Sequence, residues 1–323
     1  MLTTEQRLVM LQPPSGRIDM VLDTDAYNEI DDQFAISYAL TATERLNLLA
    51  LYAAPFHNRR SDGPRDGMEK SYQEIQKLLA LAGVARPVYH GSEDYLPDEH
   101  TPVASPAASD LAERAAGYSQ QHPLYVVAIG AITNVASAIL LRPEIADRMV
   151  VVWLGGHALE WHDNLEFNVK QDVAAARVVF DSGVPLVILP CMGVVSGFTT
   201  TGPELSHWLQ GKNPLCDYLV RQTCDEANRY AAGRVWSRVI WDVTTIGWLL
   251  NDHEQFMLDK LISTPIPEYD HHYAQDLRRP LCRYVYFIKR DPLLGDLFSH
   301  LSGAEAGDFS IRKTKAPILK MKA

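Results

Sequence analysis

Carboxylic acids are concentrated in one short stretch near the start of the chain. Residues 18–22, an apolar run interrupted by Asp19, are typical of a buried strand, and an apolar repeat at helical spacing begins at Phe34. The acids between these segments are Asp23, Asp25, Glu29, Asp31 and Asp32. They therefore occupy the loop after a strand and the first turn of a helix, which is the edge where open α/β sheets bind ligands.

Carboxylates this close together repel one another unless a positive charge lies among them. A hard divalent cation, which prefers oxygen ligands, is the simplest such charge, so the stretch predicts a metal site. The alternative is a solvated acidic loop in which Asp31 and Asp32 interact favourably with a helix dipole.

The composition is that of a globular protein: of 323 residues, 47% are hydrophobic and 22% are charged. The net charge of −10 argues against nucleic acid as a partner. We see no signal peptide and no apolar run long enough to span a membrane, so we expect a cytoplasmic protein without membrane contact. The four cysteines have no metal-binding spacing and are expected to be reduced.

Strand-like and helix-like segments alternate along nearly the whole chain. The expected strands are residues 18–22, 46–54, 87–90, 124–129, 149–154, 184–189 and 284–289. Helical patterns lie between them, a lead-in covers residues 1–17, and a polar tail follows Gly303. The pattern predicts one α/β domain over residues 1–323, with a mostly parallel, twisted, Rossmann-like sheet and helices on both faces.

Further polar residues follow other expected strands. These are His57 and Asn58, the turn at Ile129 and Gly130, and the loop 164–168, while Asp242 comes just before a short apolar helix. Since the carboxyl ends of parallel strands share one edge, we expect these groups to converge on the acidic loop.

In these motifs the chain resembles the nucleoside hydrolases, which cleave the N-glycosidic bond of ribonucleosides with calcium. That family has a DxDPGxDD loop after its first strand, and this chain has DTDAYNEIDD at 23–32. The family's Gly-Pro-Leu-Thr-Asn turn corresponds to residues 130–134, and its Gly-Gly strand end and Ala-Glu-Phe-Asn loop to 155–156 and 165–168. Its late aspartate corresponds to Asp242.

The resemblance implies hydrolysis of a ribonucleoside to free base and ribose, in a homo-oligomer. Asp25 would bind calcium and act as general base on the attacking water, and Asp23 would be a structural acid. The implied calcium ligands are Asp25, Asp32, Asp242 and the carbonyl of Ile129. The implied substrate-binding residues are Asp31, Asn58, Glu166, Asn168 and Trp241. Asp25, Asn168 and Trp241 would be catalytic.

Two departures from the family pattern affect the site. The acidic loop is two residues longer, so Asn28 or Glu29 can share the site. Trp241 stands where the pyrimidine-tolerant branch has a histidine that protonates the leaving base. The chain thus resembles the purine-preferring branch, in which a tryptophan stacks on the base. Core packing is the alternative for Trp241, and Tyr95 or Trp161 could supply a second ring.

Two other functions remain open at this stage. A phosphatase of the haloacid dehalogenase type would use Asp23 as nucleophile with magnesium, but it has no use for the Glu-Phe-Asn loop. A protein of the same fold that binds nucleosides but has lost catalysis would keep the binding pocket without the activity. The arginine-rich run 221–238 is interpreted as a solvated helix face, and the loop histidines as residues without a catalytic role.

Overall fold

The structure, a computed structural model, describes residues 2–303. The expected polar tail after Gly303 lies outside these residues. The strands are β1 (Ile18–Thr24), β2 (Leu46–Ala53), β3 (Val88–His90), β4 (Leu124–Ala128), β5 (Met149–Leu154), β6 (Leu186–Leu189), β7 (Thr199–Thr200), β8 (Arg238–Val239), β9 (Met257–Ser263), β10 (Ile266–Pro267), β11 (Tyr273–Ala274) and β12 (Leu281–Ile288).

Eleven α-helices are present in the described residues. They are α1 (Thr4–Met10), α2 (Asp31–Thr41), α3 (Pro64–Ala82), α4 (Pro106–Ala116), α5 (Thr133–Leu141), α6 (Phe167–Gln171), α7 (Val173–Asp181), α8 (Gly202–Trp208), α9 (Pro214–Ala231), α10 (Val243–Leu249) and α11 (Arg290–Ser302). None is long and apolar enough to cross a membrane.

Eight strands form one central sheet in the order β3-β2-β1-β4-β5-β6-β12-β9. All neighbouring pairs are parallel except β12 and β9, which run antiparallel at one edge. The predicted mostly parallel α/β sheet is therefore confirmed. The chain moves outward from β1 in both directions, to β2 on one side and to β4 on the other, which creates the crevice where such sheets bind ligands.

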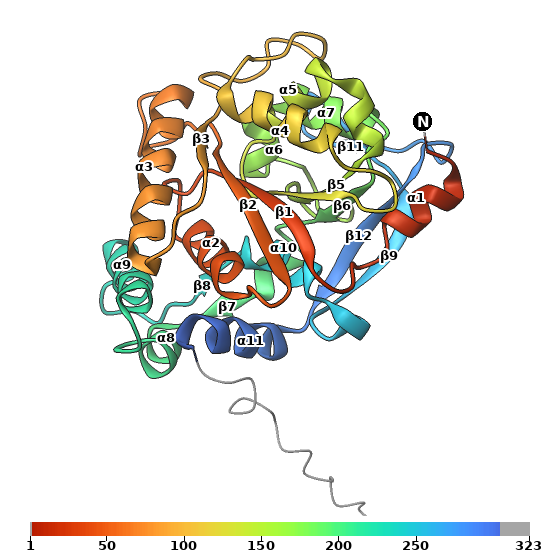
Figure 1. The fold of residues 1–323 in the computed structure, drawn as a ribbon. Helices are drawn as coiled ribbons and strands as arrows, with labels where there is room; N and C mark the ends of the chain where they lie inside the picture. Colours follow the sequence, from red (N-terminus) through yellow and green to blue (C-terminus); the bar gives the residue numbers. More distant parts are fainter. Residues whose placement is uncertain (1, 304–323) are drawn as a thin grey trace, which may run out of the picture.

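Helices cover both faces of the sheet (Figure 1), and each face carries its own hydrophobic core. Met20 and Leu22 of β1 pack with the cluster that includes Phe34 of α2 and residues of α10 and α11. Val21, between them, belongs to the opposite cluster with residues of α4, α5 and α7. Because both faces are covered, the strands read as continuous apolar runs in the sequence.

Among the described helices and strands, eight were not predicted from the sequence: the helices α1, α6 and α11, and the strands β7, β8, β9, β10 and β11. The helix α1 is closed by a capping box between Thr3 and Gln6, a signal that was present in the expected lead-in. The helical pattern of α11 is weakened by Pro292 and Gly295. The helix α3 begins at Pro64, since proline is well suited to the first helical turn.

Asn134, in the first turn of α5, ties together the strand ends that surround the crevice. Its buried amide donates to Asp23 Oδ1 (2.7 Å) and to the carbonyl of Ala53 (3.3 Å). Its Oδ1 accepts from the backbone N–H of Ser92 (2.7 Å) and from the Ser92 hydroxyl (2.9 Å). One side chain therefore joins the ends of β1 and β2 to the segment that follows β3.

Asn134→Ala is expected to lower the free energy of unfolding by about 2–4 kcal/mol, because it leaves several buried polar groups without partners. Asn47→Ala is the matched control. Asn47 donates to Asp19 (2.7 Å) at the opposite, more exposed end of β1 and β2, and its loss should cost under about 1 kcal/mol. Urea unfolding followed by tryptophan fluorescence measures both variants, and equal losses would contradict the role given to Asn134.

Candidate active site

The acidic loop leaves β1 and returns into α2 with all four of its aspartates buried. Asp23 and Asp25 are at most 1% exposed, and Asp31 and Asp32 are at most 4% exposed. Both carboxylate oxygens of Asp25 are buried without a hydrogen-bond partner among the described residues. The solvated-loop alternative is therefore wrong for these aspartates, and a group that interacts with Asp25 must come from outside the described chain.

Asp31, Asp32 and Asp242 bring carboxylate oxygens within 4.8 Å of one another. Asp32 also accepts a hydrogen bond from the hydroxyl of Thr24 (2.5 Å), which fixes the orientation of its carboxylate. Asp242 is the residue that opens α10, so it joins the cluster from a distant part of the chain. Three buried carboxylates that share one small volume, beside the unpartnered Asp25, fit a hard divalent cation with oxygen ligands.

Burial and mutual repulsion disfavour the charged forms of these acids. Burial is the main cause that raises the pKa of Asp31 to about 8, with the charge of Glu29 next. Burial also raises the pKa of Asp32 to about 6, against the hydrogen bond from Thr24. Burial, and then the charges of neighbouring aspartates, raise the pKa values of Asp25 and Asp242 well above the ordinary range. A cation would reverse this balance.

A cavity of about 260 Å³ opens beside the cluster. The residues that line it are Asp25, Asn28, Glu29, Asp31, Asp32, Asn58, Ile129, Leu154, His157, Leu165, Glu166, Phe167, Asn168, Cys191, Met192, Trp241 and Asp242. All nine site residues expected from the sequence are among them. Asp23 is not, and its Oδ1 accepts from Asn134, so the structure does not present it as a phosphatase nucleophile.

Glu166 closes the amino end of α6, an element that the sequence did not predict. Its carboxylate accepts from the backbone N–H groups of Asn168 (2.9 Å), Val169 (3.0 Å) and Gly156 (2.9 Å). Asn168 donates its amide to the carbonyl of Leu154 (3.0 Å), which leaves its Oδ1 as an acceptor. These bonds lock both polar groups against the end of β5.

Asn58 lies at the end of the β2 strand and contacts the acidic loop. Its amide donates to Asn28 Oδ1 (2.6 Å), and its own Oδ1 accepts from the backbone N–H of Arg60 (2.8 Å). Asn28 is one of the residues of the lengthened loop, and both it and Glu29 line the cavity. The longer loop therefore contributes polar groups to the cavity wall.

Trp241 is half-buried: it packs against the core and also lines the cavity. Neither of the two rings suggested as its partner belongs to the cavity wall. The hydroxyl of Tyr95 donates to Gln171, and Trp161 packs edge-on against His157 with its ring centroid 6.0 Å away.

His157 and Cys191 line the cavity, although neither was selected as a site residue from the sequence. Burial lowers the pKa of His157, and its Nδ1 accepts from the backbone N–H of Met192 (3.4 Å), so Nε2 carries the proton. Burial and the charge of Glu166 raise the pKa of the Cys191 thiol, which argues against a thiolate nucleophile. His157 directly follows the Gly-Gly strand end, and Cys191 comes just after β6, but neither residue is itself part of a motif.

Comparison with known proteins gives matches over most of the chain. The profile of the family described as inosine-uridine preferring nucleoside hydrolase matches residues 20–279. A non-specific ribonucleoside hydrolase, RihC of Salmonella paratyphi B, is 27% identical over 255 residues, covering 73% of this chain and 79% of the relative. Among solved structures, a purine-preferring ribonucleoside hydrolase from Gardnerella vaginalis (19% identity) has a TM-score of 0.71 over 88% of this chain and 98% of its own. A plant nucleoside hydrolase, PpNRh1 (17% identity), has a TM-score of 0.70 over 90% and 99% of the two chains.

Without divalent cations, the stability of the protein is expected to fall as the pH rises from about 4 to about 8. A carboxyl group with a raised pKa keeps its proton in the folded state at pH values where the unfolded chain has lost it. The folded state then binds more protons, and rising pH removes this advantage through the pKa values of Asp32 (about 6), Asp23 (about 7) and Asp31 (about 8). Thermal unfolding after chelation should show this decline.

Calcium should raise the melting temperature, and more at pH 8 than at pH 5, because metal ligands must be ionised. Asp32→Asn should remove most of that rise. A melting temperature of the chelated protein that increases from pH 5 to pH 8, or a calcium effect that Asp32→Asn leaves unchanged, would contradict the metal assignment.

Proposed function

The chain belongs to the nucleoside hydrolase family and is a ribonucleoside N-glycosidase, and we propose that it prefers purine ribonucleosides and uses Asp25 as its general base. The observation that carries the proposal is the cavity itself. Its wall holds Asp25, whose two oxygens have no partner in the described chain, beside the buried acids Asp31, Asp32 and Asp242.

The ligands proposed for calcium are the carboxylates of Asp25, Asp32 and Asp242 and the backbone carbonyl of Ile129. All four residues line the cavity and offer oxygen atoms, which suits a hard cation. When bound, the cation would attract ribose hydroxyls and lower the pKa of water in the site. Thr24, which donates to Asp32, keeps that ligand in a fixed orientation.

Asp25 Oδ is proposed to accept the proton of the attacking water. Its burial and its unpartnered oxygens support this role, since a base needs a free lone pair directed at the reacting molecule. Beside the cation the charged form of Asp25 is favoured, although burial alone raises its pKa.

The ribose is proposed to lie against Asp31, Asn58, Glu166 and Asn168. Asn168 Oδ1 and the Glu166 carboxylate are acceptors that suit hydroxyl groups of the sugar. Cleavage of the glycosidic bond develops positive charge on the ribose ring, which acceptor oxygens around the sugar stabilise. Asn168 thus both positions the substrate and assists the reaction.

Trp241 is proposed to stack on the leaving base. The residue directly before Asp242 is Trp241 and not a histidine, so no side-chain acid is evident there. A ring stacked on a purine makes the base a better proton acceptor, and solvent then supplies the proton. The large purine surface gains more from stacking than a pyrimidine does.

We also expect a single domain over residues 1–323, a homo-oligomer and a cytoplasmic location. These expectations rest on the sequence and on the family resemblance.

Asp25→Asn should retain the melting temperature within a few degrees and lower kcat by several orders of magnitude, because the proton acceptor is lost. Asp23→Asn is the matched control, two residues away but outside the cavity wall. It preserves the acceptor for Asn134 and should keep activity within about tenfold. If Asp25→Asn loses less than about tenfold, another group is the base.

Trp241→Ala should lower kcat/KM for purine ribosides about tenfold relative to pyrimidine ribosides, as expected for the loss of one stacked ring. Trp161→Ala should leave that ratio unchanged, because the Trp161 ring lies outside the cavity wall. Steady-state kinetics on one purine and one pyrimidine nucleoside measures the ratio of the two kcat/KM values. A lower melting temperature with an unaltered ratio would make Trp241 a packing residue only.

A further inference from the structure

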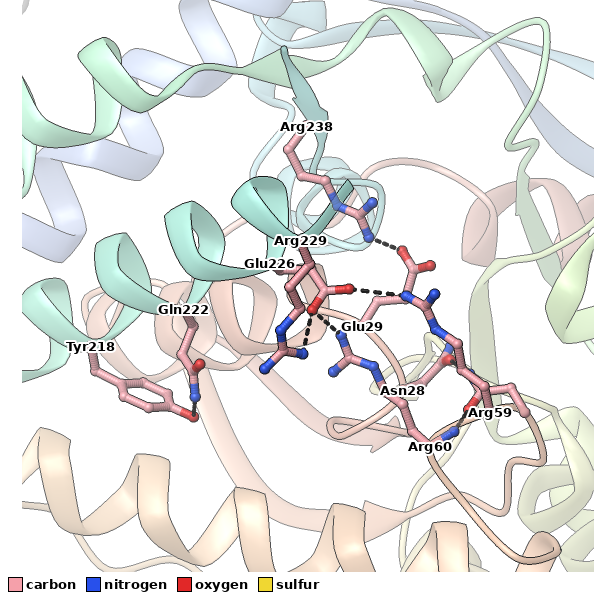
Figure 2. Close-up of polar contacts among 10 residues, drawn as sticks. Asn28, Glu29, Arg59, Arg60, Tyr218, Gln222, Glu226, Arg229 and Arg238 are labelled. Carbon is pink, nitrogen blue, oxygen red and sulfur yellow. Dashed lines mark hydrogen bonds and ion pairs between the residues drawn. The ribbon is translucent and has the colours of Figure 1, made fainter. Parts of the chain in front are cut away.

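Arginine side chains from three separate segments gather around Glu29 and Glu226 (Figure 2), and Glu29 lines the cavity. We call this group the arginine rim. Its members are Arg59 and Arg60 after β2, Arg229 near the end of α9, and Arg238 in β8, together with the carboxylates Glu29 and Glu226. The run 221–238 is therefore only partly the solvated helix face expected from the sequence.

Glu226 is the common partner of three of the arginines. Its Oε1 accepts from Arg59 (3.1 Å), and its Oε2 pairs with Arg60 (2.7 Å) and with Arg229 (2.9 Å). The Glu226 side chain is only 8% exposed, whereas those of Arg59 and Arg229 are 80% and 72% exposed. A guanidinium has five N–H donors, so Arg59 and Arg229 keep donors that face solvent.

The fourth arginine is attached to the lengthened acidic loop. Arg238 pairs with Glu29, which lines the cavity. The Nε of Arg238 is buried and has no hydrogen-bond partner among the described residues. Glu29, which belongs to the loop that is longer than the family pattern, therefore holds the guanidinium group of Arg238 beside the cavity.

The rim adjoins the cavity through its polar wall. Asn58, which lines the cavity, directly precedes Arg59, and its Oδ1 accepts from the backbone N–H of Arg60 (2.8 Å). Asn58 also donates to Asn28 of the same wall. The rim therefore adjoins the cavity wall at Asn58 and, through the pair of Arg238 with Glu29, at the lengthened loop.

The rim carries more positive charge than its own ion pairs require. Four arginines and two glutamates give 4 − 2 = +2, in a chain whose net charge is −10. One arginine paired with Glu226 would be enough to connect the β2–α3 segment to α9. Three guanidinium groups close together repel one another, so a structural role alone does not explain them. Clustered arginines with free donors are the usual recognition element for phosphate.

The stereochemistry of a ribonucleoside directs one position to the rim. The 2′- and 3′-hydroxyls lie on one face of the ribose, and the base and the C5′ substituent lie on the other. If the two hydroxyls face the acidic cluster, the base and C5′ both point away from its carboxylates. A phosphate on C5′ is then the anionic group that the arginines can reach.

We propose that the arginine rim binds a 5′-phosphate, so that this enzyme acts on ribonucleoside 5′-phosphates in preference to nucleosides. The inference rests on the proposed function. Water adds its oxygen to C1′, the C1′–N bond breaks, and the base nitrogen takes the bonding electron pair and a proton. The products are the free base and ribose 5-phosphate.

The test compares one purine nucleoside with its 5′-monophosphate on the calcium-saturated enzyme. The wild type should show a kcat/KM at least about tenfold higher for the 5′-phosphate, mainly through a lower KM, and added salt should reduce this preference. The double variant Arg59→Ala/Arg229→Ala should lose the preference and keep nucleoside hydrolysis within about twofold. Arg278→Ala, a 90% exposed arginine paired with Asp276, is the matched control and should change neither substrate.

Equal or better use of the nucleoside by the wild type would overturn the inference and leave the proposed function standing. If the double variant loses kcat/KM equally on both substrates, the rim has a structural role only, and the inference is also overturned. Calorimetric binding of the same two compounds to Asp25→Asn measures the preference without turnover. A 5′-phosphate that binds no more tightly than the nucleoside would contradict the inference even if neither compound is hydrolysed.

Discussion

The burial of several like-charged carboxylates at the carboxyl end of one strand is the constraint on which the rest of the structure depends. Ionised acids in a low-dielectric site are costly unless cations or donors surround them. The chain supplies some compensation: Asp31 and Asp32 lie in the first turn of α2, and Asp242 opens α10, so both helix dipoles favour negative charge there. Both oxygens of Asp25 lack a hydrogen-bond partner among the described residues, so this compensation is incomplete.

The sheet makes such a concentration possible because its order places four strand ends side by side. The order β2-β1-β4-β5 brings Asn58, the acidic loop, Ile129 and the Glu166 loop to one edge. Asn134 of α5 ties the ends of β1 and β2 to the segment that follows β3. Buried polar contacts therefore hold the strand ends next to the cavity, and they lie beside an acidic loop that is longer than the family pattern.

Much of the fold was predictable from local pattern. Met149–Leu154 coincides with its prediction because a strand covered on both faces is a continuous apolar run. β9 was missed because it is an antiparallel edge strand with mixed exposure. The cavity residues that carry motifs were predicted, whereas His157 and Cys191 became visible only when tertiary structure brought them together. Likewise, nothing in the sequence joins Arg238 to Glu29, because that contact spans 209 positions.

The central claim is that the acidic cluster holds a cation that ribose then contacts. A crystal structure of the unmodified protein with calcium and a non-hydrolysable purine ribonucleoside analogue tests it most directly. The account predicts an anomalous peak between Asp32, Asp242 and the Ile129 carbonyl, with the ribose hydroxyls against it. A nucleoside in the cavity with no peak there, or calcium bound only at another surface, would contradict the account.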